Sequence, residues 1–273
     1  MKDLILFFLM VLCSTSYAQI TKQWQTGPIM EVPESVKYYT KENCLFVSNI
    51  VGKPADKDGN GYISKLSVDG KVISQKWLVG LDAPKGMAIN DGVLYVSNID
   101  ELVAIDIEKA EILTRVKRSD AKFLNDVTVA SDGKVFVSDS ATGIVYLLFK
   151  GELVVWLQKE GVVGVNGLYA EHDYVLVGTN TNILKVDIDT REMSVFVETT
   201  GQVDGLEADG YGGYYYSYWK GELFYFKPGN EPVQLLNSSV DNVQSADIGY
   251  NPNTNEVLVP TFFSNEVVSY LKD

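Results

Sequence analysis

Histidine and cysteine are scarce in this chain of 273 residues, which contains one histidine and two cysteines. Cys13 lies in an apolar leading segment, so Cys44 is the cysteine of the remaining chain. A lone cysteine forms no internal disulfide, and we interpret Cys44 as a small buried apolar residue. His172 lies in a predicted turn, and no serine or cysteine motif occupies an equivalent position. A hydrolytic triad is therefore disfavoured.

Long apolar runs are also scarce, because the leading segment MKDLILFFLMVLCSTSYAQ is the one stretch of this kind. In it, Lys2 precedes an apolar run from Leu4 to Leu12, and small residues follow at Ser16 and Ala18. We predict a signal peptide over residues 1–18, which is too short and wrongly flanked for a membrane span. The mature protein is expected to be secreted or periplasmic, with no membrane span.

Positive charge is in deficit, because 23 Lys and Arg stand against 36 Asp and Glu and give a formal net charge of −13. The predicted signal peptide carries one charge of each sign, so its removal leaves the balance unchanged. An acidic surface disfavours nucleic acids and anionic membranes as partners. It suits a protein that handles small molecules or cations, and we expect a monomer.

What the chain has in abundance is a repeat of ~40 residues, which is the period of a β-propeller blade. Each unit has a polar start, a short strand, a turn, a second strand that ends in a polar residue, and two more strands. Four complete copies begin with APKGMAIN, KFLNDVTV, GVNGLYAE and QVDGLEAD, and cover residues 83–116, 122–157, 164–197 and 202–236. A fifth copy over residues 33–79 precedes them, and a shorter sixth copy over residues 245–273 follows.

The sixth copy lacks a fourth strand, and a segment at the other end of the chain supplies one. ITKQWQTG, residues 20–27, resembles the fourth strands ISQKWLVG and ELVVWLQ of other copies. We predict that this N-terminal strand completes the last blade and closes the ring, which leaves only short protected edges. The predicted fold is all-β, a six-bladed β-propeller over residues 19–273. A pair of β-sandwiches is the competing architecture, which the near-constant period disfavours.

The stretch ADKDGNGYISKL, residues 55–66, nearly matches a calcium loop. Asp56, Asp58 and Asn60 stand at the first, third and fifth positions of an EF-hand pattern. An EF-hand also needs flanking helices and a bidentate Glu at the twelfth position, where this chain has Ser67. We interpret the stretch as a turn and the third strand of the first blade. A weak surface calcium site is the alternative.

Equivalent positions at the start of the first strand carry a polar side chain in five of the six copies. They are Glu34, Lys85, Asn125, Asn166, Asp204 and Ala246. In a propeller these strand starts converge on one mouth of the central channel. The two carboxylates and two amides offer oxygen ligands, which suit Ca²⁺ or Mg²⁺. Asn and Asp also favour turns for structural reasons alone, and that alternative stays open.

Four motifs resemble those of the SMP-30/gluconolactonase/LRE-like family of six-bladed propellers. They are PES at 33–35, LNDVTVASDGKVFVSD at 124–139, VNGL at 165–168 and VDGLEADGYGG at 203–213. The resemblance covers essentially the whole mature chain. It implies one divalent cation in the channel mouth, Ca²⁺ first with Mg²⁺ or Zn²⁺ as alternatives, held by Glu34, Asn166 and Asp204. It also implies that Asn125 contacts substrate or bound water.

The chemistry that the resemblance implies is metal-dependent opening of a lactone or a similar ester. The cation would polarise the ester carbonyl, and Asp204 would bind the cation and also take a proton from the attacking water. The second strands end at the same mouth, which makes Asp139 a candidate substrate contact. Lys122 and Lys85 are further candidates, the first beside a position that contacts sugar in the family.

Two features depart from the family pattern. Phe123 stands where the sugar lactonases have an Arg, and residues 140–143 hold no clear match for a sugar-contacting Glu, so an aldonolactone substrate is disfavoured. Lys85 either reaches solvent or lies in the channel. In the channel its ammonium would pair with Glu34 or Asp204 and weaken or replace the metal. A non-catalytic binding propeller for small molecules or metal and a protein-interaction scaffold are the alternatives to a hydrolase.

Overall fold

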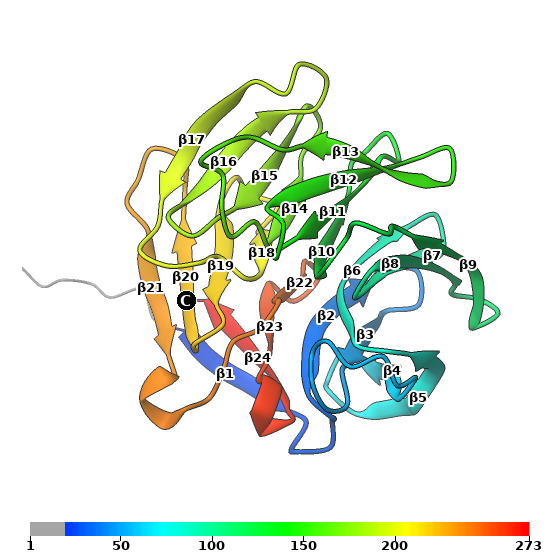
Figure 1. The fold of residues 1–273 in the computed structure, drawn as a ribbon. Helices are drawn as coiled ribbons and strands as arrows, with labels where there is room; N and C mark the ends of the chain where they lie inside the picture. The colour runs from blue at the N-terminus through cyan, green and yellow to red at the C-terminus, as the bar shows by residue number, and fades with distance from the viewer. Residues whose placement is uncertain (1–19, 273) are drawn as a thin grey trace, which may run out of the picture.

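The computed structural model describes residues 20–272, and the predicted signal peptide lies outside this range. Strands β1 to β24 form six four-stranded antiparallel sheets around one axis (Figure 1). The predicted six-bladed β-propeller is thereby confirmed. The described residues also contain two short 3-10 helices, η1 (Ser239–Asp241) and η2 (Phe262–Ser264). No helix within residues 20–272 has the length and hydropathy to span a membrane.

The blades follow the sequence repeats. Blade 1 contains β2 (Pro33–Tyr39), β3 (Cys44–Asn49), β4 (Gly61–Ser67) and β5 (Val72–Leu81). Blade 2 contains β6 (Pro84–Asn90), β7 (Val93–Asn98), β8 (Glu101–Asp106) and β9 (Glu111–Lys117). Blade 3 contains β10 (Leu124–Val129), β11 (Val135–Asp139), β12 (Ile144–Phe149) and β13 (Glu152–Leu157). Blade 4 contains β14 (Leu168–Ala170), β15 (Tyr174–Gly178), β16 (Asn182–Asp187) and β17 (Met193–Glu198). Blade 5 contains β18 (Leu206–Ala208), β19 (Tyr214–Tyr218), β20 (Glu222–Phe226) and β21 (Val233–Asn237). Blade 6 contains β22 (Gly249–Asn251), β23 (Glu256–Pro260), β24 (Val267–Lys272) and β1 (Ile20–Gln25).

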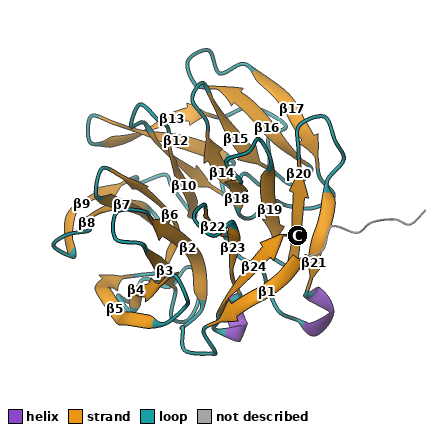
Figure 2. Ribbon diagram, turned by 180° about the vertical axis from the view of Figure 1, so that it is seen from behind, coloured by secondary structure: helices purple, strands orange, loops and turns teal. Residues whose placement is uncertain are grey.

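The N-terminal strand closes the ring as the sequence predicts. Strand β1 pairs antiparallel with β24 and is the outermost strand of blade 6, so the first and last described strands share one sheet (Figure 2). Trp24 of β1 donates its indole N–H to Glu256 Oε2 at 3.3 Å and packs against the core between blades 6 and 1. Sheet closure by the first strand thus covers the edge that the short sixth repeat leaves open.

The core consists of apolar layers between neighbouring blades. Each of the six junctions has its own cluster of buried side chains. Between blades 1 and 2, for example, Phe46 packs on Trp77 with ring centroids 4.6 Å apart and lies in one cluster with Met87 and Leu94. The second strands are covered on both faces, and β3 is buried at every residue. That burial explains why runs such as VLYVSN are almost continuously apolar.

Gly167 and Gly205 give the N-G and D-G motifs a structural cause. A Cβ on Gly167 would lie 2.3 Å from the carbonyl oxygen of Asp204, and one on Gly205 would lie 2.3 Å from the backbone nitrogen of Ile248. The innermost strands therefore approach one another too closely for any side chain at these positions. The preceding residues, Asn166 and Asp204, are held on a tightly packed backbone at the axis.

The calcium-like stretch is a loop that leads into a strand. Asn60 donates its backbone N–H to Asp58 Oδ1 and Gly59 donates to Asp82 Oδ1, both at 3.0 Å. Residues 61–67 are β4, the third strand of blade 1, as the repeat alignment predicts. No helix flanks this stretch in the described chain, so it has no EF-hand architecture.

Candidate functional site

The first strands of all six blades begin at one face of the propeller, which we call the channel mouth. A cavity of 450 Å³ opens there on the axis. Its polar lining comes from Glu34, Lys85, Asn125, Ser140, Asn166, Gln202 and Asp204. Its apolar lining comes from Ile50, Pro54, Phe123, Trp219, Phe262 and Phe263. Residues from all six blades, far apart in sequence, thus share one cavity.

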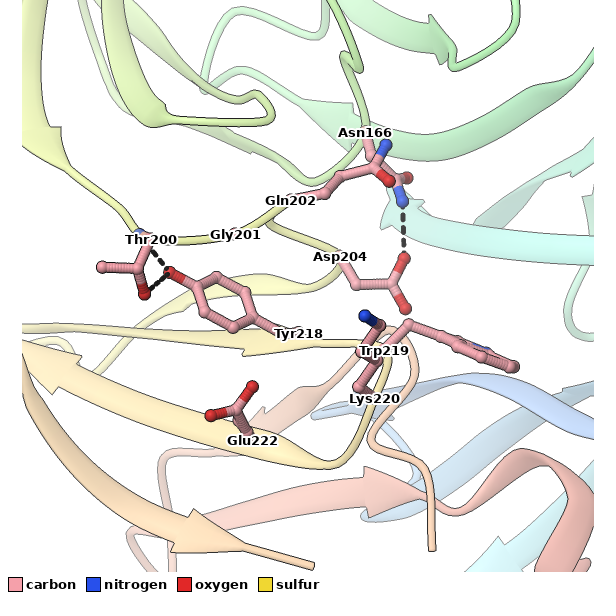
Figure 3. A pocket seen from close by; sticks show the side chains of 9 residues that line it. All are labelled: Asn166, Thr200, Gly201, Gln202, Asp204, Tyr218, Trp219, Lys220 and Glu222. Atoms are coloured by element: carbon pink, nitrogen blue, oxygen red, sulfur yellow. Dashed lines mark hydrogen bonds between the residues drawn. The ribbon is translucent and has the colours of Figure 1, made fainter. Parts of the chain in front are cut away.

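The structure brings the predicted metal ligands together at the bottom of this cavity. Glu34, Asn166 and Asp204 are only 5%, 6% and 6% exposed, respectively, and Asn125 is 8% exposed. The Asn166 amide donates to Asp204 Oδ1 at 2.5 Å, and Asn125 donates to Ser140 Oγ at 3.0 Å. Figure 3 shows the Asn166 amide directed at the Asp204 carboxylate. The carboxylates of blades 1 and 5 and the amides of blades 3 and 4 therefore line one polar floor.

Two oxygen atoms on this floor are buried without a hydrogen-bond partner. They are Glu34 Oε2 and Asp204 Oδ2, one from each carboxylate. A buried carboxylate oxygen without a donor or a cation is costly, because it has lost its hydration without replacement. The pair of uncompensated oxygens is the kind of environment that a bound cation satisfies.

The electrostatics of the floor point the same way. Burial, followed by the charges of Asp204 and Asp247, raises the pKa of Glu34 well above its ordinary range. Burial, followed by the charge of Asp247, raises the pKa of Asp204 to about 7. Both shifts mean that the ionised carboxylates are poorly stabilised by the protein alone. A divalent cation between them would stabilise the ionised carboxylates and so lower both pKa values.

A second buried polar layer lies deeper in the channel, and sequence reasoning missed it. Ser35 donates to Asp247 Oδ2 at 2.5 Å, and Asp126 accepts the backbone N–H groups of Val127 and Leu168, both at 2.6 Å. Burial raises the pKa of Asp247 to about 7. Burial, followed by the negative charge of Asp247, raises the pKa of Asp126 well above its usual range. The signal for this layer was the residue that follows the mouth position in blades 1, 3 and 6, which is Ser35, Asp126 and Asp247.

Lys37 and Glu207 form an ion pair at the lower end of this layer. The negative charges of Glu207, Asp247 and Asp126 raise the pKa of Lys37 despite its burial. Its ammonium is therefore the positive charge that offsets part of the deeper acidic layer. The unpartnered oxygens of Glu34 and Asp204 remain on the mouth side.

The donor set fits a hard cation in composition. Within residues 20–272 no cluster of three or more His, Cys, Asp and Glu side chains is arranged to hold a metal. The set at the mouth is instead mixed, with two carboxylates, Glu34 and Asp204, and the amide of Asn166. Oxygen ligands of this kind suit Ca²⁺ or Mg²⁺ better than a thiophilic metal. These three residues are the ones that could hold an ion here.

Lys85 does not reach solvent, because it is 1% exposed. Its ammonium donates to the carbonyl oxygens of Pro54 at 2.8 Å and Ala83 at 3.1 Å, and lies 4.3 Å from the ring centroid of Phe123. Burial lowers the pKa of Lys85 to about 8, while the charge of Glu34 opposes that shift. Within the described chain it forms no ion pair within 4.0 Å. The ammonium is held at the cavity wall, where it influences the floor through space.

Two predicted substrate contacts lie away from the cavity surface. Asp139 is fully buried, and its carboxylate accepts backbone N–H groups from Lys122 at 2.8 Å and Phe123 at 3.2 Å. The same carboxylate accepts from Ala141 at 3.1 Å and Thr142 at 3.2 Å. The side chain of Lys122 is exposed and does not line the cavity. Asp139 therefore fixes the loop that carries Phe123, and neither Asp139 nor the side chain of Lys122 lines the cavity.

A side cleft of 400 Å³ adjoins the mouth between blades 4 and 5. It shares Asn166, Gln202, Asp204 and Trp219 with the central cavity and also includes Lys220. Figure 3 shows its wall, where the Tyr218 hydroxyl is directed at Thr200 and accepts the backbone N–H of that residue at 2.8 Å. Trp219 lines both the side cleft and the central cavity.

Comparison with known proteins supports the fold. No family model and no curated protein sequence matches the chain. The structure of a candidate gluconolactonase gives a TM-score of 0.71 at 17% identity, and the match covers 94% of this chain and 93% of that one. The match thus extends over nearly the whole propeller, and the fold is similar to that of a gluconolactonase-like protein.

Other propellers are similar at comparable levels. A catalytically inactive histidine-to-alanine variant of virginiamycin B lyase from Staphylococcus aureus, solved with quinupristin, gives a TM-score of 0.63 at 10% identity, covering 93% of this chain and 99% of that one. The WD40 propeller domain of Doa1 gives 0.65 at 12% identity, covering 88% and 78%. At such identities these likenesses show the fold alone, so the function has to be argued from the site.

Proposed function

We propose that this protein is an exported hydrolase that opens lactones or similar esters at a divalent cation in the channel mouth. Glu34, Asn166 and Asp204 would hold the ion, with Ca²⁺ as the first candidate and Mg²⁺ or Zn²⁺ as alternatives. The observation that carries the proposal is the pair of buried carboxylate oxygens without partners, Glu34 Oε2 and Asp204 Oδ2. The sequence motifs and the fold shared with a candidate gluconolactonase support the same conclusion.

The protein's own residues supply the remaining functions. The bound cation would supply Lewis-acid polarisation of an ester carbonyl. Asn125, held by Ser140 at 3.0 Å, presents its amide oxygen to substrate. Asp204 presents Oδ2 as a proton acceptor for an attacking water, because its other oxygen accepts from Asn166. The apolar cavity wall lowers the local dielectric constant beside the floor and so would strengthen the electrostatic interactions there.

A lyase reaction of the kind catalysed by virginiamycin B lyase has less support. That enzyme is inactivated when one of its histidines is replaced by alanine. The one histidine of this chain, His172, lies between β14 and β15, at the end of the channel opposite the mouth. Its ring is highly exposed and contacts Ser131 at 2.9 Å. A second candidate function is a propeller that binds a small molecule or metal without turnover, which the same cavity would permit.

The test is acid release from a panel of lactones by the mature protein, before and after chelation and re-addition of Ca²⁺, Mg²⁺ or Zn²⁺. We expect chelation to abolish turnover and one of the ions to restore it. Asp204→Asn should lower kcat/KM by about 100-fold or more, since it removes both a ligand charge and a proton acceptor. Asp189→Asn, which changes an exposed carboxylate on the opposite face, is the matched control and should stay within about twofold.

Calorimetric titration of each ion provides a readout that is independent of turnover. We expect Asp204→Asn to weaken ion binding while Asp189→Asn retains it. A folded protein that binds an ion but turns over no lactone would favour the binding propeller. A protein that neither binds an ion nor releases acid would contradict the proposed site and favour the protein-interaction scaffold.

A further inference from the structure

One side of the mouth cavity is an aromatic wall, which we define as Trp219, Phe262 and Phe263. The Trp219 ring meets Phe262 edge-on at 5.4 Å and Phe263 at 6.0 Å, and the two phenylalanine rings lie 4.8 Å apart. Trp219 follows β19 of blade 5, whereas both phenylalanines belong to η2 of blade 6. The wall thus joins two neighbouring blades and lines the same cavity as Asp204. Figure 3 shows its Trp219 near the Asp204 carboxylate.

The wall exposes apolar surface next to a polar site. Phe263 is 60% exposed and Trp219 is 40% exposed, although the surrounding blades bury most of their aromatic side chains. Exposed apolar patches beside a cavity mark ligand-binding surfaces, because water contact with such groups is unfavourable. The apolar lining continues around the cavity through Ile50, Pro54 and Phe123. The exposed rings therefore belong to one concave apolar surface above the polar floor.

The loop that carries Phe262 and Phe263 is built to stay in place. Thr261 and Glu266 close it with three hydrogen bonds of 2.9, 3.0 and 3.0 Å. Asn265 then ties it to blade 1, because its side-chain oxygen accepts from the backbone of Val32 at 2.8 Å. Phe262 itself has φ +49°, which is unusual for a bulky residue and costs free energy. Its buried ring packs with Ile50, Ala83 and Ala246, so packing holds this conformation.

The opposite side of the cavity offers few groups for hydroxyl recognition. The Lys85 ammonium is engaged by two backbone carbonyls and the Phe123 ring. The Asn125 amide nitrogen is engaged by Ser140. A polyhydroxylated ligand would place hydroxyl groups against the rings of Trp219 and Phe263, which offer no hydrogen-bond acceptor, and hydroxyl groups buried without a partner are costly. An apolar chain in the same place would bury its surface against the wall.

We propose that the mouth cavity selects lactones or esters that carry an apolar alkyl or aryl substituent, and that the aromatic wall binds this substituent. The reacting carbonyl faces the floor of Glu34, Asn166 and Asp204, and the substituent lies along Trp219 and Phe263. The proposal rests on the proposed function for the reacting group, whereas the apolar part of the ligand follows from the wall alone.

The experiment compares γ-valerolactone with γ-nonalactone, which has four more methylenes on the same ring, and includes gluconolactone. We expect kcat/KM to rise about threefold for each added methylene, because each buries more apolar surface on the wall. Trp219→Ala and Phe263→Ala should each lower the ratio of the long to the short substrate by about tenfold. Tyr211→Ala, which removes a 73% exposed ring in the β18–β19 turn on the opposite face, should leave both rates unchanged.

Two non-hydrolysable lactams, 5-methyl- and 5-pentyl-2-pyrrolidinone, separate this proposal from the hydrolase. We expect calorimetry to show tighter binding of the pentyl compound, and Trp219→Ala to remove the preference. That result without any lactone turnover would contradict the proposed hydrolase activity and still support the apolar binding site. Equal kcat/KM for both lactones, preference for gluconolactone, or lactams that bind equally or not at all would overturn the apolar site.

Discussion

At the residue scale, Lys85 is the one of the six residues at the starts of the first strands that carries a positive charge. Its ammonium is held by the carbonyl oxygens of Pro54 and Ala83, yet its charge lowers the pKa of Glu34 against burial. The interaction acts through space, since the pair lies beyond 4.0 Å and forms no ion pair. The positive charge of Lys85 therefore partly stabilises the ionised Glu34 carboxylate. It would weaken the binding of a cation there without occupying the cation's position.

We expect Lys85→Met to strengthen Ca²⁺ binding by about fivefold to thirtyfold. Removal of one nearby positive charge corresponds to on the order of 1–2 kcal/mol in a partly screened interior. Lys122→Met removes the same charge from an exposed side chain that does not line the cavity, and should change affinity by less than about twofold. Calorimetric titration of both folded variants measures the difference. Equal affinity in Lys85→Met and the parent protein would show that Lys85 does not oppose the ion.

The sequence predicted which residues lie at the channel mouth better than it predicted the role of each side chain. The repeat register placed Glu34, Asn166 and Asp204 on one floor, because equivalent positions of successive blades must meet at the axis. Asp139 was predicted as a substrate contact because the second strands end at the same mouth, but its carboxylate accepts four backbone N–H groups. An Asp at a strand end suits both roles, and only the path of the neighbouring loop distinguishes them.

At the scale of the element, the innermost strands were predictable as strands but not in their spacing. Alternation and turn residues predict β18, whereas the backbone approach that excludes a side chain at Gly205 depends on the neighbouring blade. The aromatic wall was unpredictable for a related reason. The loop conformation at η2, with Phe262 at positive φ, is set by contacts with blade 1 and with Ala246. The position of the Lys85 ammonium likewise depends on the carbonyl oxygen of Pro54, which lies in a loop of another blade.

The close approach of these strands predicts the effect of Gly205→Ala. The new Cβ would lie 2.3 Å from the backbone nitrogen of Ile248, so the backbone has to move. We expect the free energy of unfolding to fall by about 3 kcal/mol. Gly201→Ala is the control, because its Cβ would meet only the edge of the Tyr218 ring at 3.1 Å and should cost less than about 1 kcal/mol. Urea denaturation of both variants measures the difference, and equal stabilities would contradict the tight-axis interpretation.

At the scale of the whole molecule, the propeller concentrates acidic groups on its axis. Glu34, Asp126, Asp204 and Asp247 come from different blades and share one buried channel, and burial raises the pKa of each. Lys37 offsets part of this charge at the lower end. Ring closure by β1 locks the six blades together, so the mutual repulsion cannot relax by opening the ring. The stability of the fold therefore depends on the protons or cations that neutralise the buried carboxylates of the channel.

This linkage predicts how stability depends on pH. The pKa of Asp204 and that of Asp247 are each raised from 3.8 to about 7, so the folded protein binds more protons than the unfolded chain between those values. The resulting stabilisation is fully present below about pH 4 and is lost as pH rises through about 7. The pKa of Lys85 is lowered to about 8, so its contribution falls outside this window. As pH rises from about 8 toward the pKa of Lys85 in the unfolded chain, this group adds to the stability of the fold.

We therefore expect the chelated protein to lose stability between pH 5 and pH 8, and Ca²⁺ to restore it chiefly at pH 8, where the carboxylates are ionised. The expected rise in Tm on adding Ca²⁺ is roughly 5–10 °C at pH 8 and smaller at pH 5, for a gain of a few kcal/mol in a domain of this size. Asp247→Asn keeps the size of the side chain and removes one titrating group, so it should flatten the pH dependence in chelator. Calorimetric unfolding at both pH values measures the effect. A chelated protein that is more stable at pH 8 than at pH 5 would mean that the buried carboxylates are satisfied by the protein alone, and the argument for a cation in the channel would fail with it.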